Sequence, residues 1–205
     1  MLSAIFQKIQ KKSRQKKFDL FMEKFKPTPQ TTILDVGCGD GTFLEEMYPW
    51  PENITCLEIS KENIKQFRDR YPDIVIIEGD ACNMPFIDNS FDIVFSNAVI
   101  EHVGGLANQE KYASEVRRVS KKHFITTPNK LFPFEPHFRL PLFQFVPKSI
   151  QKWLSKRIAL GNYPKGCWEN INLLTPWQLQ ELFLDSYLIA QRVTFMAETL
   201  IAIKE

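Results

Sequence analysis

The sequence predicts an α/β protein with a mostly parallel sheet and helices on both faces. Three observations support this prediction. Short apolar runs of strand length alternate with segments whose apolar residues recur at helical spacing. The first such run enters the glycine-rich segment 35–41, as a strand enters a nucleotide-binding turn. Two apolar runs near the end of the chain, 188–195 and 199–203, are spaced like an antiparallel hairpin.

A basic amphipathic segment, residues 1–30, is predicted to form one or two helices ahead of the main domain, 31–205. Pro27 and Pro29 are expected to end the helical pattern. Residues 1–26 contain eight Lys or Arg and two acidic residues, a net charge of +6, so the other 18 basic and 22 acidic residues sum to −4. Because the main domain is not broadly basic, nucleic-acid binding is not expected.

Five apolar segments are predicted to be the parallel strands, and helices are expected between them. The predicted strands are 31–36, 54–57, 74–77, 91–96 and 123–127. The predicted helices are 42–48, 61–70 and 110–120. Ser60 is a suitable N-cap for the second of these helices. Segment 91–96 has three consecutive apolar residues, which is typical of a strand that is buried on both faces.

The pattern changes after residue 128, where an insertion is predicted at about 130–165. Residues 129–147 contain five phenylalanines and four prolines and are predicted to form a long loop. Residues 148–160 have the pattern of a basic amphipathic helix, and Gly161 is placed to end it. A capping box from Thr175 to Gln178 then predicts another helix.

Three interpretations of this insertion are open. Its aromatic residues are suited to a lid that excludes water from an apolar substrate. Its basic helix, together with the basic N-terminal segment, is suited to peripheral contact with an anionic membrane surface. The third interpretation is that the aromatic residues complete the core and the lysines form a solvated face.

The glycine-rich turn is the most informative motif. Asp35 stands at the strand end, before the first glycine, where a pyrophosphate would be poorly accommodated and a ligand with an ammonium group would be well accommodated. Glu58 ends the second strand, at about the interval where an acid meets ribose hydroxyls in this class of fold. Asp80 follows the third strand, and its carboxylate is suited to accept a hydrogen bond from the adenine amino group. Taken singly, these could be an incidental turn, a solvated charge and a turn residue.

Taken together, segments 33–43, 78–86 and 91–103 and Glu58 resemble the class I S-adenosylmethionine-dependent methyltransferases, in particular the small-molecule group of ubiquinone and menaquinone biosynthesis. The resemblance implies a Rossmann-like sheet of seven mostly parallel strands with a C-terminal antiparallel hairpin, and S-adenosyl-L-methionine as the cofactor. The cofactor-binding residues that it implies are Asp35, Gly37, Cys38, Gly39, Gly41, Glu58, Ile59, Asp80, Ala81, Asn97 and Ala98. Glu58 departs from the Asp of many members.

Methyl transfer from a sulfonium is a direct displacement, so alignment supplies much of the catalysis and a base is needed only for a protonated acceptor. The candidate catalytic residues are His102 and His137; the alternative for each is a packing or hydrogen-bonding role. His123 begins a strand and is predicted to be structural.

The predicted function is therefore methyl transfer to a small-molecule or lipid-linked acceptor. A non-catalytic protein that binds the same cofactor is the alternative, and a dinucleotide oxidoreductase is disfavoured by the acid before the first glycine. The four cysteines lie far apart without a Cys-x-x-Cys pair, so reduced thiols in a cytoplasmic protein and no metal site are expected. No apolar run is long enough to span a bilayer, which leaves peripheral membrane contact as the expected mode of association.

Overall fold

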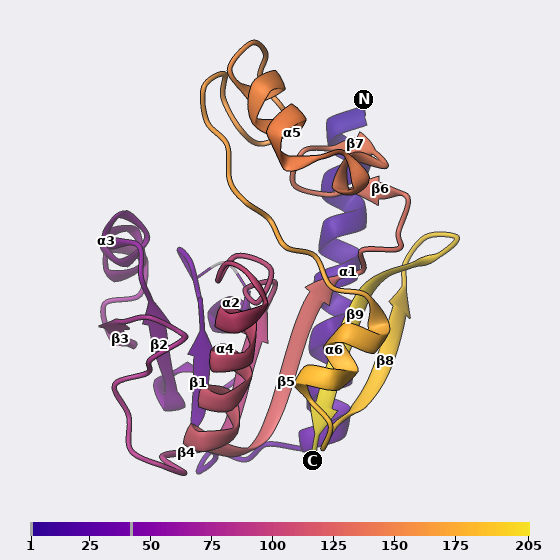
Figure 1. The fold of residues 1–205 in the computed structure, drawn as a ribbon. Coiled ribbons are helices and arrows are strands. Elements are labelled where there is room, and N and C mark those ends of the chain that lie inside the picture. Colours follow the sequence, from indigo (N-terminus) through magenta and orange to yellow (C-terminus); the bar gives the residue numbers. More distant parts are fainter. Residues whose placement is uncertain (1, 42) are drawn as a thin grey trace.

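A seven-stranded sheet organises the protein (Figure 1), as predicted. The structure is a computed structural model that describes residues 2–41 and 43–205. The strands are β1 (Ile33–Val36), β2 (Ile54–Glu58), β3 (Val75–Glu78), β4 (Phe91–Asn97), β5 (Ser120–Pro128), β8 (Tyr187–Arg192) and β9 (Ala197–Lys204). Their order is β3-β2-β1-β4-β5-β9-β8, with antiparallel pairing only where β9 joins β5 and β8. The C-terminal hairpin therefore closes one side of a parallel sheet.

Helices cover both faces of this sheet. The helices on the sheet are α1 (Leu2–Phe25), α2 (Leu44–Met47), α3 (Lys61–Arg70), α4 (Leu106–Val119) and α6 (Pro176–Leu182), with the short 3-10 turn η1 (Pro51–Asn53). Helix α5 (Lys148–Ser155) and the 3-10 turn η2 (Phe143–Phe145) lie in the insertion after β5. Side chains alternate along each strand, so Leu34 packs in the cluster with α4 and α6, whereas Ile33 packs in the cluster with α1, α2 and α3. The predicted helix 42–48 is reduced to α2, and Thr42 lies outside the described residues.

The N-terminal helix belongs to the core and is one continuous helix. Phe21 of α1 is fully buried and makes edge contacts with Phe95 of β4 and Phe124 of β5, at centroid distances of 5.3 and 5.7 Å. Rings that meet edge to face add to the free energy of burial. Although the segment is basic, its C-terminal half is therefore held to the sheet by aromatic packing.

The insertion after β5 has more structure than the predicted loop. Strands β6 (Phe134–Glu135) and β7 (Leu140–Pro141) pair as a small antiparallel ladder, and η2 and α5 follow. Figure 1 shows this insertion standing beyond the carboxyl end of β5, away from the sheet. It has its own small apolar cluster, made of Phe138, Phe143, Leu160, Ile171 and Leu173. The aromatic residues of this segment thus partly serve a local core.

Among the described residues, no helix combines the length and the apolar character that are needed to cross a membrane.

Candidate functional site

The glycine turn after β1 has the backbone conformation that its sequence predicts. Gly37, Gly39 and Gly41 have φ values of +72°, +62° and +75°, which residues other than glycine rarely adopt. A Cβ at Gly37 would lie 2.4 Å from Val99, and one at Gly41 would meet the Phe67 ring at 2.8 Å. At Gly39, no atom of the described residues lies within 4 Å of the place that a Cβ would take. Gly37 and Gly41 therefore allow close packing, whereas Gly39 faces open space.

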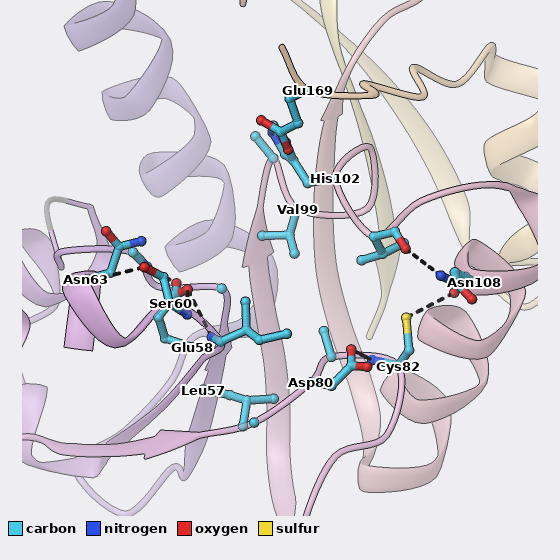
Figure 2. A pocket seen from close by; sticks show the side chains of 17 residues that line it. Leu57, Glu58, Ser60, Asn63, Asp80, Cys82, Val99, His102, Asn108 and Glu169 are labelled. Carbon is cyan, nitrogen blue, oxygen red and sulfur yellow. Dashed lines mark hydrogen bonds and ion pairs between the residues drawn. The ribbon is translucent and has the colours of Figure 1, made fainter. Parts of the chain in front are cut away.

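That open space belongs to a cavity of about 640 Å³ at the carboxyl ends of the parallel strands (Figure 2). This volume is within the usual range for small-molecule sites. Figure 2 shows Glu58 and Ser60 on one side, Asp80, Cys82 and Asn108 on another, and His102 beside Glu169 at a third. The residues that line the cavity are Gly37, Gly39, Leu57, Glu58, Ile59, Ser60, Asn63, Gly79, Asp80, Ala81, Cys82, Ala98, Val99, His102, Val103, Asn108 and Glu169.

The structure brings most of the predicted cofactor residues to this cavity. Those that line it are Gly37, Gly39, Glu58, Ile59, Asp80, Ala81 and Ala98. Those that are not among its lining residues are Asp35, Cys38, Gly41 and Asn97. Asp35 is buried within β1, at the base of the turn. Sequence reasoning missed Glu169, because it follows the insertion and carries no local motif.

Glu58 ties the glycine turn to the end of β2. Its Oε2 accepts a hydrogen bond from the N–H of Gly39 at 2.9 Å. Its Oε1 accepts from the N–H groups of Ile59 and Ser60, at 3.0 and 2.8 Å. An ionised carboxylate has about four acceptor positions, so this carboxylate keeps capacity for a ligand. The side chain therefore shapes the turn in addition to facing the cavity.

Replacing Glu58 with Ala is expected to weaken binding of S-adenosylmethionine by about 1.5–3 kcal/mol, the usual worth of hydrogen bonds to a charged group. That is roughly a ten- to 150-fold increase in Kd, measured by titration calorimetry. Glu78→Ala is the matched control, because Glu78 pairs with Glu58 in register on β3 but does not line the cavity. Equal losses in the two variants, or none in Glu58→Ala, would contradict a ligand contact at Glu58.

Asp80 and Cys82 form a turn at another wall of the cavity. Oδ1 of Asp80 accepts from the N–H of Cys82 at 2.8 Å, and the Cys82 thiol donates to the carbonyl of Asn108 at 3.3 Å. Burial and the Asp80 charge raise the pKa of Cys82 to about 11. The thiol therefore stays protonated at neutral pH and is not a nucleophile.

Asn97 is directed toward α1 and β5. Its Oδ1 accepts from Nζ of Lys17 at 2.5 Å and from Oγ1 of Thr126 at 2.9 Å. Burial lowers the pKa of Lys17 to about 8, although the charge of Glu101 acts in the opposite direction. The adjacent Ala98, with a φ of +59°, lines the cavity in its place.

The two predicted catalytic histidines meet, although only His102 lines the cavity. Nδ1 of His102 lies 2.6 Å from Oε1 of Glu169, and Nδ1 of His137 lies 2.7 Å from Oε1 of Glu135. The ring centroids are 5.0 Å apart, and the rings are nearly perpendicular. The insertion therefore brings His137 to the edge of the cavity region, next to a histidine that follows β4.

The charges and the hydrogen bond around His102 raise its pKa by more than burial lowers it. Burial lowers the pKa of His102, but the hydrogen bond to Glu169 and the charge of Glu101 raise it, so that the net pKa lies above the ordinary value. The same hydrogen bond lowers the pKa of Glu169, which also accepts from the hydroxyl of Tyr163 at 2.7 Å. The third histidine, His123, is buried in β5 with Nε2 at 2.7 Å from Oγ of Ser186, and burial lowers its pKa to about 4.

Comparison with known proteins shows which class this fold and cavity define. Residues 34–124 match the model of the methyltransferase domain family. The chain is 36% identical over 93 residues to a demethylmenaquinone methyltransferase of Renibacterium salmoninarum, covering 45% of this chain and 38% of that protein. It is 33% identical over 155 residues to an uncharacterized protein of Mycobacterium tuberculosis, covering 70% of this chain and 52% of that protein.

Solved structures share the whole fold. A protein from Pyrococcus horikoshii OT3 superposes with a TM-score of 0.64 at 20% identity, covering 94% of this chain and 89% of that one. A SAM-dependent methyltransferase from Aquifex aeolicus superposes with a TM-score of 0.61 at 16% identity, covering 97% and 96%. At these identities the likeness concerns the fold alone.

A class I S-adenosylmethionine-dependent methyltransferase, which the resemblance of its motifs implied, is supported by the match over residues 34–124, by relatives named as probable S-adenosylmethionine-dependent methyltransferases and by the shared fold. The cofactor of this family is S-adenosylmethionine. The cavity fits that ligand, because the space at Gly39 is open and the carboxylates of Glu58 and Asp80 stand on separate walls. The chain spans about half the length of the curated relatives that it matches.

Proposed function

We propose that this protein binds S-adenosylmethionine in the cavity and transfers its methyl group to a small-molecule or lipid-linked acceptor. The observation that carries the proposal is the open glycine turn at Gly39, which faces a cavity walled by Glu58 and Asp80 and bordered by His102. The match to the methyltransferase domain family supports it. Relatives of this chain include proteins named as probable S-adenosylmethionine-dependent methyltransferases.

In this proposal the protein contributes binding and alignment. Glu58 accepts from the ribose hydroxyls, and Asp80 with Ala81 holds the adenine. Gly37 and Gly39 let the backbone approach the methionine part. The bound sulfonium supplies an activated methyl group together with its own leaving group. Because the displacement needs an in-line approach, orientation of the acceptor is the main catalytic contribution that the chain makes.

The acceptor side of the proposed site is the region of His102 and His137. Either imidazole is suited to accept a proton from an acceptor hydroxyl or amine in the transition state. Glu169 and Glu135 hold the two rings through Nδ1 and so fix their orientation. His137 comes from the insertion, which makes the insertion part of the acceptor site in this proposal.

An apolar or lipid-linked acceptor is favoured by the surface of the insertion. Segment 139–168 contains six Lys or Arg and no acidic residue. Its large exposed apolar side chains are Leu142, Phe145, Ile150, Trp153 and Ile158. Exposed apolar groups among basic ones suit an anionic membrane surface. We propose that this protein is cytoplasmic and contacts such a surface. Co-sedimentation with phosphatidylglycerol vesicles, weaker as salt rises, is expected, and equal binding to neutral vesicles would contradict the contact.

Titration calorimetry tests the proposed cofactor. S-adenosylmethionine and its demethylated product are expected to bind, and NAD is not; binding of NAD alone would overturn the proposal.

Methyl transfer is then tested with radiolabelled S-adenosylmethionine and separate aqueous and lipid extracts of cells. Label is expected in an extracted acceptor, and binding without transfer to either extract would favour the non-catalytic alternative.

A further inference from the structure

Three side chains that can ligate metals meet beside the cavity. Glu101 and His102 follow β4, and His137 comes from the insertion. One ligand atom from each of the three lies within 4.8 Å of the others. The cysteine spacing predicted no metal site, but this cluster contains no cysteine and depends on contacts between distant segments. Its position next to the cavity makes its chemistry relevant to the acceptor.

Glu101 has an unused acceptor. The side chain is fully buried, and its Oε2 accepts from Oγ1 of Thr127 at 2.9 Å. Its Oε1 is buried and has no hydrogen-bond partner within the described part of the chain. A buried carboxylate oxygen without a partner costs free energy, and such groups are rare in native proteins. This oxygen therefore indicates a missing ligand.

The two histidines are already oriented in the way that metal sites orient them. Each ring has its Nδ1 on a carboxylate, His102 on Glu169 and His137 on Glu135, which leaves Nε2 of each ring for another ligand. Histidines that bind metals usually direct their other ring nitrogen to a carboxylate or carbonyl group. Both carboxylates also accept a second hydrogen bond: Glu135 from the N–H of Phe138 at 2.5 Å, and Glu169 from the hydroxyl of Tyr163.

We propose that Glu101, His102 and His137 bind one divalent transition-metal ion. Two imidazoles and one carboxylate suit Zn²⁺, Mn²⁺ or Fe²⁺ better than Ca²⁺ or Mg²⁺, which prefer oxygen ligands alone. The cluster and its two supporting carboxylates include three acids, which outnumber the two lysines, Lys17 and Lys148, whose charges act on Glu101 and Glu135, and this balance also favours a cation. Such an ion completes the coordination of the unpartnered Glu101 oxygen.

The consequence for chemistry rests on the proposed function. His102 also lines the cavity, so an ion held by it stands next to the acceptor. A divalent ion lowers the pKa of a coordinated hydroxyl, which makes that oxygen a better nucleophile for a methyl group. With the ion bound, His102 and His137 act as ligands, and the acceptor loses its proton to solvent or to a neighbouring carboxylate.

Metal binding is tested without cofactor or acceptor, so its failure is distinguishable from failure of the proposed function. Chelator-treated protein is titrated with ZnCl₂ or MnCl₂ by calorimetry, and the bound metal is counted by elemental analysis after desalting. About one ion per chain is expected for at least one of the two metals. Less than about one tenth of an ion per chain for both metals would overturn the proposal and leave the histidines in the proton-transfer role.

Variants locate the ion. Glu101→Gln and His137→Ala are each expected to weaken metal binding at least tenfold, with circular dichroism and thermal unfolding confirming that they fold. Cys167→Ser is the control, because Cys167 is an exposed thiol outside the cluster and its loss should change nothing. Glu135→Gln supplies a second test: it removes no ligand, yet it should weaken binding by loosening His137. Unchanged affinity in folded Glu101→Gln and His137→Ala would overturn the assignment.

Discussion

Gly39→Val is expected to abolish binding of S-adenosylmethionine while the protein remains folded. The Gly39 backbone has a φ of +62°, and a side chain there would point into open space and not into packed atoms. A branched side chain would occupy the proposed place of the cofactor, and valine disfavours this backbone region. A loss of at least about 100-fold in affinity, roughly 3 kcal/mol, is expected from titration calorimetry.

Two other glycines give this result its controls. Gly105 precedes α4 with an ordinary φ of −77° and nothing within 4 Å of a Cβ, so Gly105→Ala should keep full affinity. Gly37→Ala should instead lower stability, because its Cβ would meet Val99 at 2.4 Å. Undiminished affinity in folded Gly39→Val would place the cofactor away from the turn.

Phe138→Ala is expected to unfold the insertion locally and leave the sheet intact. Phe138 is buried and contacts the rings of Phe143 and Tyr163 at 4.9 and 5.1 Å. Truncation of a buried phenylalanine costs about 3–5 kcal/mol. The small cluster of the insertion has few other apolar contacts to offset that loss. Hydrogen exchange is expected to speed up across 130–173 and to stay slow in β1 and β4, while S-adenosylmethionine affinity is kept.

The control for this variant is Phe145→Ala in the same segment. The Phe145 side chain is 55% exposed, so its removal should change stability by no more than about 0.5 kcal/mol. Turnover is expected to fall in Phe138→Ala, because local unfolding of the insertion would break the hydrogen bond from the backbone N–H of residue 138 to Glu135 and so release His137, which Glu135 holds. Loss of cofactor affinity, or cooperative unfolding of the whole chain, would contradict an independent insertion core.

The insertion is also where sequence reasoning was least accurate. Five phenylalanines among prolines predicted a long loop and left open whether its rings form a lid over a substrate or complete the core. The structure buries the rings of Phe138 and Phe143 in a local core and leaves Phe145 exposed. An apolar residue in an irregular segment has no periodicity to show which way its side chain points, so only the packed structure distinguishes core from surface there.

The sheet was predictable because its signals are local. A strand such as β4, buried on both faces, needs consecutive apolar residues, and these are visible in Ile93, Val94 and Phe95. The conformation of the glycine turn was predictable for a similar reason, since a backbone with positive φ favours glycine at that position. The packing of α1 on the sheet was not predictable from the sequence, because the helix is held there by contacts between residues far apart in the chain, such as Phe21 and Phe124.

By itself, the sequence determined the class of fold, the position of the glycine turn and the residues that follow each parallel strand. These depend on backbone conformation and on burial patterns within a few residues. Only the tertiary structure decided that Asn97 pairs with Lys17, that Glu169 reaches His102, and that His137 lies beside Glu101. Those contacts join segments whose separation in the chain carries no pattern, because the distances between them are set by how α1 packs on the sheet and by where the insertion places its side chains.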